Sequence, residues 1–540
     1  MPAPLARPQL ISGSRATALG TLASRVLGML RDMATAALLG LSGGGVMDAF
    51  VLAFRIPNTF RRLFGEGALA ASYLPVIAAE LERQPQRAWK LASVLFARLA
   101  VLLLLLLLAG EAFLGGVALA FDSPEIRLLA SLAAIMLPYM LLICLAAQAS
   151  ATLHALGHFA LPAFVPTILN VVWLVAAVAV APRISPVKAV QAQVLAVAIL
   201  IAGVLQLAVQ FPLLRARGFR FDYDPGAVRD TFALILKAMG PMTVGLMITQ
   251  INTLVDSLVA WLLSSPSRAS GPIPWMGGCL DYPMSQGAVG ALYYGERLYQ
   301  FPLGILGLAV ATAIFPLLSR HAARNDLPRF SQDLSLGLRL VLFLGVPASA
   351  GLVLLAEPLA RLLFQHREFT SEDALRTAKV IAGYSWGVWA YCALPVIVRA
   401  YYALGDRITP IRIGLATLAL VFALNLVLVW FIAETGLALS TSIGASLQVT
   451  VLAVLFSRRK VRLGWPLLAA TSSKTIIATA LMSAAAVAAT ELLPHAAGLT
   501  GRLLDVVIPL AIAIAAYLAA AWFLKIRELR LLFVWGAKAE

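Results

Sequence analysis

Long apolar stretches, separated by short polar turns, make up most of this sequence. A helix that crosses a membrane needs about 20 mostly apolar residues, and the chain contains fourteen stretches of that kind. Breaker residues mark most of the gaps, as at Asp122–Pro124 and Asp224–Gly226. The pattern predicts an all-α integral membrane protein with fourteen transmembrane helices. The predicted spans are 14–40, 48–79, 91–121, 127–156, 160–181, 188–212, 230–263, 286–319, 332–356, 376–403, 409–433, 437–457, 472–492 and 503–524.

The predicted spans contain an internal repeat. Ala49–Ile56 aligns with Ala291–Leu298 at an offset of 242 residues, and Ala155–Gly157 aligns with Ala403–Gly405 at an offset of 248. Short matches arise by chance in apolar sequence, but two independent pairs with nearly the same offset argue against chance. Because each copy has six spans, both copies enter the membrane in the same direction, which is typical of transporters. We expect a lobe of helices 1–6 at 1–220, a lobe of helices 7–12 at 221–465, and two extra helices with a tail at 466–540.

The composition excludes an ordinary soluble domain. The 540 residues are 61% hydrophobic and 13% charged, whereas soluble proteins are roughly 45–50% apolar and about 25% charged. The net charge of +16 would suggest nucleic acid in a soluble protein, but here it indicates basic cytoplasmic loops. Roughly 22 of the 42 Lys and Arg lie in segments that are cytoplasmic if the N-terminus is inside. We therefore expect both termini in the cytoplasm and no nucleic-acid partner.

Charged residues inside the predicted spans are the strongest chemical signal. A charge at bilayer depth costs at least ~2.5 kcal/mol and usually faces a cavity or a partner. Arginines outnumber the acids here, and the planar guanidinium suits pairs of phosphate oxygens. The sequence therefore predicts a central cationic cavity for an anion; salt bridges that only fix helix packing, such as Arg25 with Asp32 or Arg62 with Glu66, are the alternative. The residues concerned are Arg25, Arg31, Asp32, Asp48, Arg55, Arg61, Arg62, Glu66, Glu296 and Arg297.

A second polar group consists of Asn252 and Asp256, four residues apart on one helical face, and Asn425. Their oxygens could hold Na⁺ or a proton, although hydrogen bonds between helices explain them equally well. The sequence predicts no catalytic residue, because it has no P-loop, and its one GxSxG match, Gly40–Gly44, lies in a glycine-rich turn between two apolar spans and does not follow a strand, as a nucleophile elbow requires. Three widely spaced cysteines without a CxxC motif predict no metal site and no disulfide framework.

Several of these segments resemble the MviN/MurJ family of lipid II flippases, within the superfamily that also contains MATE drug exporters and O-antigen flippases. The resemblance implies a transporter, not an enzyme, for a peptidoglycan precursor. It implies movement of undecaprenyl-pyrophosphoryl-MurNAc-pentapeptide-GlcNAc from the inner to the outer leaflet of the bacterial cytoplasmic membrane, by alternating access between two lobes. The resembling segments are Ala23–Asp32, Asp48–Phe50, Arg55–Asn58, Arg61–Ala68, Gln250–Asn252, Tyr293–Leu298 and Phe301–Pro302.

The resemblance also implies roles for residues. Helices 13 and 14 would form a groove for the polyprenyl tail. Two departures are Gln300, where relatives often carry an acid, and Gly43–Val46, which lengthen an outer turn. The expected substrate-binding residues are Arg25, Arg31, Arg61, Arg62 and Arg297. The expected gating and charge-pairing residues are Asp32, Asp48, Arg55, Glu66 and Glu296.

Two alternatives stay open. A flippase for another polyprenyl-linked glycan would need the same arginines, and only the motif resemblance separates it from a lipid II flippase. A MATE-type ion-coupled drug antiporter would have acids and aromatic residues in its cavity instead of arginines. The expected partners are lipid II, membrane lipids and the cell-wall synthesis machinery, and the expected state is a monomer. No cofactor is expected beyond Na⁺ or H⁺ coupling and the membrane potential.

Overall fold

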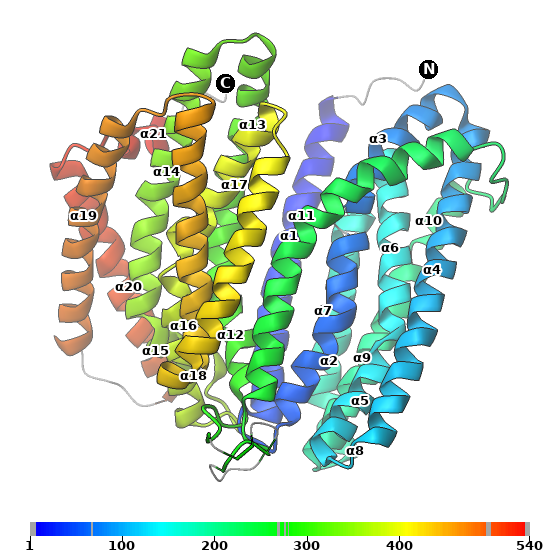
Figure 1. The fold of residues 1–540 in the computed structure, drawn as a ribbon, viewed down its shortest axis with the longest axis horizontal. Helices are drawn as coiled ribbons and strands as arrows, with labels where there is room; N and C mark the ends of the chain where they lie inside the picture. Colours follow the sequence, from blue (N-terminus) through cyan, green and yellow to red (C-terminus); the bar gives the residue numbers. More distant parts are fainter. Residues whose placement is uncertain are drawn as a thin grey trace. The chain divides into compact units, whose positions relative to one another are not determined.

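The structure, a computed structural model, describes residues 7–65, 68–266, 271–274, 277–278, 280–492 and 498–534. These residues are almost entirely helical, and the β-structure among them consists of two isolated bridges, Ser264 with Met284 and Pro272 with Asp281. Figure 1 labels most of the helices. From the N-terminus to residue 262 they are α1 (Arg7–Leu39), α2 (Val46–Phe60), α3 (Ala68–Arg83), α4 (Pro85–Ala120), α5 (Pro124–Met136), α6 (Pro138–Ala155), α7 (Ala160–Val175), α8 (Ala181–Ile184), α9 (Lys188–Ala208), α10 (Phe211–Ala216) and α11 (Arg229–Leu262).

The chain divides into two compact units. The first contains residues 1–254 together with 367–369, and the second contains the rest. Helix α11 therefore begins in the first unit and ends in the second. The helices that follow are α12 (Ala288–Pro302), α13 (Leu308–Ala323), α14 (Leu327–Leu354), α15 (Ala356–Phe364), α16 (Ser371–Ser385), α17 (Val388–Ala403), α18 (Ile408–Arg459), α19 (Trp465–Leu492), α20 (Gly498–Phe523) and α21 (Arg527–Val534).

The internal repeat is confirmed at the level of local structure. Helix α2 follows a left-handed Gly45 and runs into a π turn, η1 (Arg61–Gly65). Helix α12 follows a left-handed Gly287 and runs into a π turn, η4 (Leu303–Gly307). Every one of these boundaries is shifted by 242 residues, the offset that the sequence predicts. Gly157 and Gly405, which end α6 and α17, likewise share a positive φ, of 77° and 78°.

Within the described residues, ten helical segments are long and apolar enough to cross a membrane. Nine of them coincide with one predicted span each, and the 52-residue α18 contains two. The backbone of α18 leaves the helical region at Ile432 and Ala433, the last two residues of the first of those predicted spans. The other predicted spans, 14–40, 48–79 and 230–263, are also helical over their described residues, as α1, α2 to α3, and α11. These segments carry most of the intramembrane charges that the sequence analysis identified.

Helix α7 packs against the first two helices of the first unit, α1 and α2. Its Trp173 is 1% exposed and lies edge-on to Phe50 and Phe54 of α2, at ring-centroid distances of 5.3 and 5.0 Å. Such aromatic pairs add about 0.5–1.5 kcal/mol to the burial of their apolar area. Helix α1 also packs on α7, at the close approach of Gly20, where an added Cβ would lie 2.7 Å from the carbonyl oxygen of Ala163. Helices α1 and α2, which carry the charged residues, therefore both pack against α7.

The break in α18 generates a prediction about stability. Ala433 has φ 50° and ψ −138°, a conformation that glycine adopts readily and other residues adopt at a cost of about 1–3 kcal/mol. We expect Ala433→Gly to raise the unfolding temperature of the purified protein in detergent, measured by thermal denaturation. The control is Ala416→Gly, at an exposed helical position of the same helix, which should lose about 1 kcal/mol. Equal losses in both variants would show that Ala433 carries no strain.

Candidate functional site

Helix α1 places its predicted site residues in different surroundings. Arg25 is exposed, and its guanidinium has no hydrogen-bond or ion-pair partner among the described residues. Arg31 and Asp32 are 5% and 2% exposed, and Arg31 donates to Oδ1 of Asp32 from Nη2 (2.6 Å) and Nε (3.0 Å). Asp32 therefore pairs with its neighbour and not with Arg25, which lies about 10 Å away along the helix axis.

Two residues of α7 complete the surroundings of Arg31. Asn170 accepts a hydrogen bond from Nη1 of Arg31 at 3.0 Å, and the ring of Trp173 lies 4.3 Å from the guanidinium carbon. Trp173 also donates from Nε1 to Oγ1 of Thr35, at 3.0 Å. The sequence analysis missed Asn170, although an asparagine inside an apolar span is a signal that could have identified it. It also missed Trp173, which the sequence does not distinguish from other core aromatic residues.

Helix α2 and its π turn hold the second charged group. Asp48 and Arg55 are 2% and 6% exposed, and Arg55 donates from Nη1 to the carbonyl oxygen of Thr253 at 2.9 Å. Arg61 and Arg62 are half-buried in the π turn that follows Pro57. The turn is a local widening that frequently occurs at functional sites. Glu66 lies outside the described residues.

The two arginines of the π turn contact neutral side chains. Arg61 donates from Nε to Oδ1 of Asn58 at 3.1 Å, and Nη1 of Arg62 lies 3.5 Å from Oε1 of Gln250 in α11. A neutral acceptor orients a guanidinium without cancelling its charge. These contacts orient the two guanidinium groups.

Helix α12, in the second unit, also carries an arginine that contacts a neutral side chain. Glu296 and Arg297 are half-buried, and Arg297 donates from Nη2 to the hydroxyl of Tyr293 at 2.7 Å. The guanidinium carbon lies 4.6 Å from the centroid of the same ring, which adds a cation–π interaction. Arg297 occupies the position equivalent to Arg55 in the repeat, but it is the more accessible of the two.

Two residues of the predicted ion site, Asp256 and Asn425, contact each other inside the second unit. Asn425 donates from Nδ2 to Oδ1 of Asp256 at 2.6 Å, and Thr441 donates to Oδ2 at 3.2 Å. Asp256 is 4% exposed and Asn425 is fully buried, and Oδ1 of Asn425 accepts no hydrogen bond among the described residues. Asn252 belongs to the first unit, which extends to residue 254. Thr441 was missed because a threonine in a transmembrane helix has no distinctive sequence signal.

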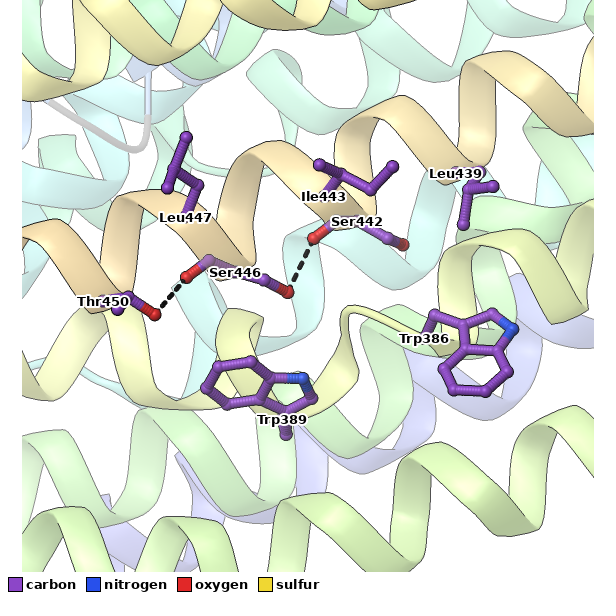
Figure 2. Close-up of a pocket in the computed structure, with 8 residues that line it drawn as sticks. All are labelled: Trp386, Trp389, Leu439, Ser442, Ile443, Ser446, Leu447 and Thr450. Carbon is purple, nitrogen blue, oxygen red and sulfur yellow. Dashed lines mark hydrogen bonds between the residues drawn. The ribbon is translucent and has the colours of Figure 1, made fainter. Parts of the chain in front are cut away.

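A cavity of about 510 Å³ lies between α18 and the junction of α16 with α17. Figure 2 shows Trp386 and Trp389 facing the stripe formed by Ser442, Ser446 and Thr450. The hydroxyls of Ser446 and Thr450 each donate to the carbonyl one turn earlier, at 2.8 Å. No charged residue lines this cavity, so its chemistry does not suit a phosphate group.

The comparison with known protein families identifies the family of this chain. The sequence model of the family described as "Lipid II flippase MurJ" matches residues 35–507. The chain belongs to the MurJ family. A "Probable lipid II flippase MurJ" of Vibrio cholerae is 33% identical over 452 residues, which cover 80% of both chains. The "Lipid II flippase MurJ" of Burkholderia cenocepacia is 32% identical over 449 residues, covering 80% of this chain and 81% of that one.

Solved structures share the fold. The structure titled "Lipid II flippase MurJ, inward closed conformation" has a TM-score of 0.73 at 24% identity, covering 94% of this chain and 98% of that one. An inward-facing multidrug transporter of the MATE family has a TM-score of 0.66 at 13% identity, covering 83% and 96%. The fold is thus common to MurJ and MATE proteins, and it is the sequence family that separates them.

The buried pair of Arg31 and Asp32 generates a second prediction. Removing one partner of a buried ion pair leaves an uncompensated charge, which typically costs 3–5 kcal/mol. We expect Arg31→Met to lower the unfolding temperature strongly in a thermal melt. The double variant Arg31→Met with Asp32→Leu should recover most of the loss, because both charges are then absent. A double variant as unstable as the single one would contradict the pairing.

Proposed function

We propose that this chain is a flippase that moves lipid II from the inner to the outer leaflet of the bacterial cytoplasmic membrane by alternating access. Membership of the MurJ family, matched over residues 35–507, is the observation that carries the proposal. The relatives are named as flippases for this lipid, which makes the chain a transporter and not an enzyme. The expected partners are lipid II, membrane lipids and the cell-wall synthesis machinery, with the protein as a monomer.

The proposed membrane arrangement has fourteen spans and both termini in the cytoplasm. Ten apolar helical segments support it, as does the break at Ile432 and Ala433, which divides α18 into two lengths that could each cross. Helices α1, α2 to α3, and α11 would supply the other spans, their charges facing the cavity. We retain the lobes proposed at 1–220 and 221–465, and the segment 466–540 that follows them.

The proposed ligand of the arginines is the pyrophosphate of lipid II. Arg25 is exposed and without a partner among the described residues, so its guanidinium is available to an anion. Arg61, Arg62 and Arg297 are half-buried and would add further donors. Arg31 is buried against Asp32, and we therefore assign it to the positioning of α1. We assign the charge pairing that accompanies gating to Asp32, Asp48, Arg55, Glu66 and Glu296.

The membrane potential would favour this direction of transport. Moving one charge through 100 mV is worth about 2.3 kcal/mol, and the outside of the membrane is positive. The potential therefore assists the outward movement of an anionic pyrophosphate. It also assists the inward return of an empty cavity that carries net positive charge.

Helices α19 and α20 are proposed to bind the polyprenyl tail. They expose large apolar side chains, among them Ile476, Leu481 and Val507, as a lipid-facing surface requires. A buried ion pair of Arg339 in α14 with Glu528 in α21, at 3.1 Å, ties this pair of helices to the rest of the second unit. A tail bound there would stay in lipid while the headgroup crosses.

The role of Arg25 is testable. We expect Arg25→Ala to lower the rate of lipid II transport about tenfold or more, because a hydrogen bond to a charged group is worth about 1.5–3 kcal/mol. The measurement reconstitutes the protein in vesicles with labelled lipid II and follows its appearance in the outer leaflet with an impermeant lipid II-cleaving enzyme. Arg25→Lys should be intermediate, since a lysine retains the charge but not the planar fork.

The matched control for this experiment is Arg412→Ala, which removes an exposed arginine from the start of α18. Its transport rate should equal that of the unmodified protein. Transport by Arg25→Ala at the unmodified rate would refute the assignment of Arg25. Failure of the unmodified protein to move lipid II, while another polyprenyl-linked glycan is moved, would refute the proposed substrate.

We further propose that a monovalent cation, Na⁺ or a proton, binds at Asp256 and couples to transport. The carboxylate of Asp256 is 4% exposed and accepts hydrogen bonds from Asn425 and Thr441, and burial of a carboxylate favours the binding of a cation or a proton. Asn425 places beside it a buried oxygen that accepts no hydrogen bond from the part of the chain that the structure describes, and oxygen atoms are the ligands that hard cations prefer. Asn252, one helical turn before Asp256, is the further candidate that the sequence names.

Two variants distinguish coupling to Na⁺ from coupling to a proton. Asp256→Asn should abolish the stimulation of transport by either an imposed Na⁺ gradient or an imposed pH gradient. Asn425→Leu should remove only a Na⁺ response, because a proton binds the carboxylate without the amide oxygen. The control Asp333→Asn removes a carboxylate that pairs with His321 instead. Full retention of ion-stimulated transport in Asp256→Asn would exclude this site.

A further inference from the structure

One side chain of α7 bridges two turns of α1. Asn170 is 6% exposed, and its Nδ2 lies 2.9 Å from the carbonyl oxygen of Ser24 and 3.3 Å from the hydroxyl oxygen of the same residue. Its Oδ1 accepts from Nη1 of Arg31 at 3.0 Å. Ser24 and Arg31 are seven residues apart, about 10 Å along the helix. The donor and the acceptor of a single amide thus hold two separate turns of α1.

Small residues of α1 allow this bridge to form. Gly20 lies so close to α7 that a Cβ there would be 2.7 Å from the carbonyl oxygen of Ala163, and a Cβ at Gly28 would be 3.7 Å from Nδ2 of Asn170. Helices that pack through small residues approach closely enough for a short side chain to span the gap. The asparagine therefore reaches the backbone of Ser24 and the guanidinium of Arg31 from one position.

The bridge sets the rotation of α1 about its own axis. Residues seven apart on an α-helix differ by about 20° in direction, so Ser24 and Arg31 share the face that meets α7. Arg25 follows Ser24 by one residue and points about 100° further round, where it is exposed. Any rotation that turned Arg25 toward α7 would break the hydrogen bonds of Asn170 with Ser24 and with Arg31.

We propose that Asn170 is a positioning residue, which locks α1 so that Arg31 is held inward with Asp32 and Arg25 is presented to the substrate. The inference rests on the proposed function for the role of Arg25. A neutral amide suits this place, because the ion pair of Arg31 and Asp32 carries no net charge. An aspartate at position 170 would retain the acceptor, lose the donor to Ser24, and add a negative charge near the anion site.

The first test reads the orientation of α1 without any substrate. A cysteine is placed at position 25 in a chain whose Cys144, Cys279 and Cys392 are replaced by alanine, and its labelling by an impermeant charged thiol reagent is timed in membrane vesicles. Asn170→Leu should slow the labelling about threefold or more, because a helix that is free to rotate spends time with position 25 against α7. The matched control is Gln148→Leu, which removes another buried amide of the first unit, one that bonds to Ala92 in α4. It should leave the labelling rate unchanged.

The second test measures the kinetics of lipid II transport. Asn170→Asp, with Arg25 intact, should raise the half-saturating concentration of lipid II about tenfold and leave the maximal rate within about twofold. A purely structural defect would instead lower the maximal rate through loss of folded protein. If Asn170→Leu shows no cooperative thermal transition, the labelling of position 25 is measured in Asn170→Asp, where slowing is again expected.

Unchanged labelling in a folded Asn170 variant overturns the positioning role, whatever the transport assay shows. A normal half-saturating concentration in Asn170→Asp overturns its link to Arg25. Failure of the unmodified protein to move lipid II would refute the proposed function alone, because the labelling experiment does not depend on lipid II transport and still reports on α1.

Discussion

A charge carried by a membrane-spanning helix must be either neutralised or given access to water or a ligand, because lipid provides neither. Most of the informative contacts in this chain follow from that constraint. Arg31 with Asp32, Arg339 with Glu528, and Arg376 with Glu434 are ion pairs whose side chains are at most 17% exposed. Each pair neutralises two charges within one unit, and the pairs of Arg339 with Glu528 and of Arg376 with Glu434 also join different helices. These three ion pairs therefore neutralise charges that lipid would not stabilise.

Other arginines of the chain meet the same constraint differently. Arg25 is exposed, and Arg61, Arg62 and Arg297 are half-buried beside Asn58, Gln250 and Tyr293. A neutral partner fixes the direction of a guanidinium without itself cancelling the charge. Under the proposed function, the paired arginines hold the helices that present the accessible arginines to the substrate. The contrast between neighbouring Arg25 and Arg31 illustrates this division within a single helix.

The two copies of the internal repeat share one backbone structure but place their equivalent arginines in different surroundings. Helices α2 and α12 have the same length, the same left-handed glycine before them and the same π turn after them. Arg55 is nevertheless buried against a backbone carbonyl, whereas its equivalent Arg297 is half-buried against a tyrosine. The duplicated backbone is set by glycine, proline and apolar spacing. The chemistry at each copy depends on the side chains that surround it.

The sequence alone determined the fold class, the repeat offset and the family, because these depend on apolar length, helix-breaking residues and a contiguous motif. It also identified which spans carry charge, because a charged residue within an apolar stretch can be recognised from the sequence directly. It did not determine which charge meets which partner. The pairing of Asp32 with Arg31 instead of Arg25, the bridge made by Asn170 and the place of Thr441 beside Asp256 were decided by the tertiary structure. Contacts between helices depend on rotation and depth, and residues far apart in the chain fix both only when the helices pack.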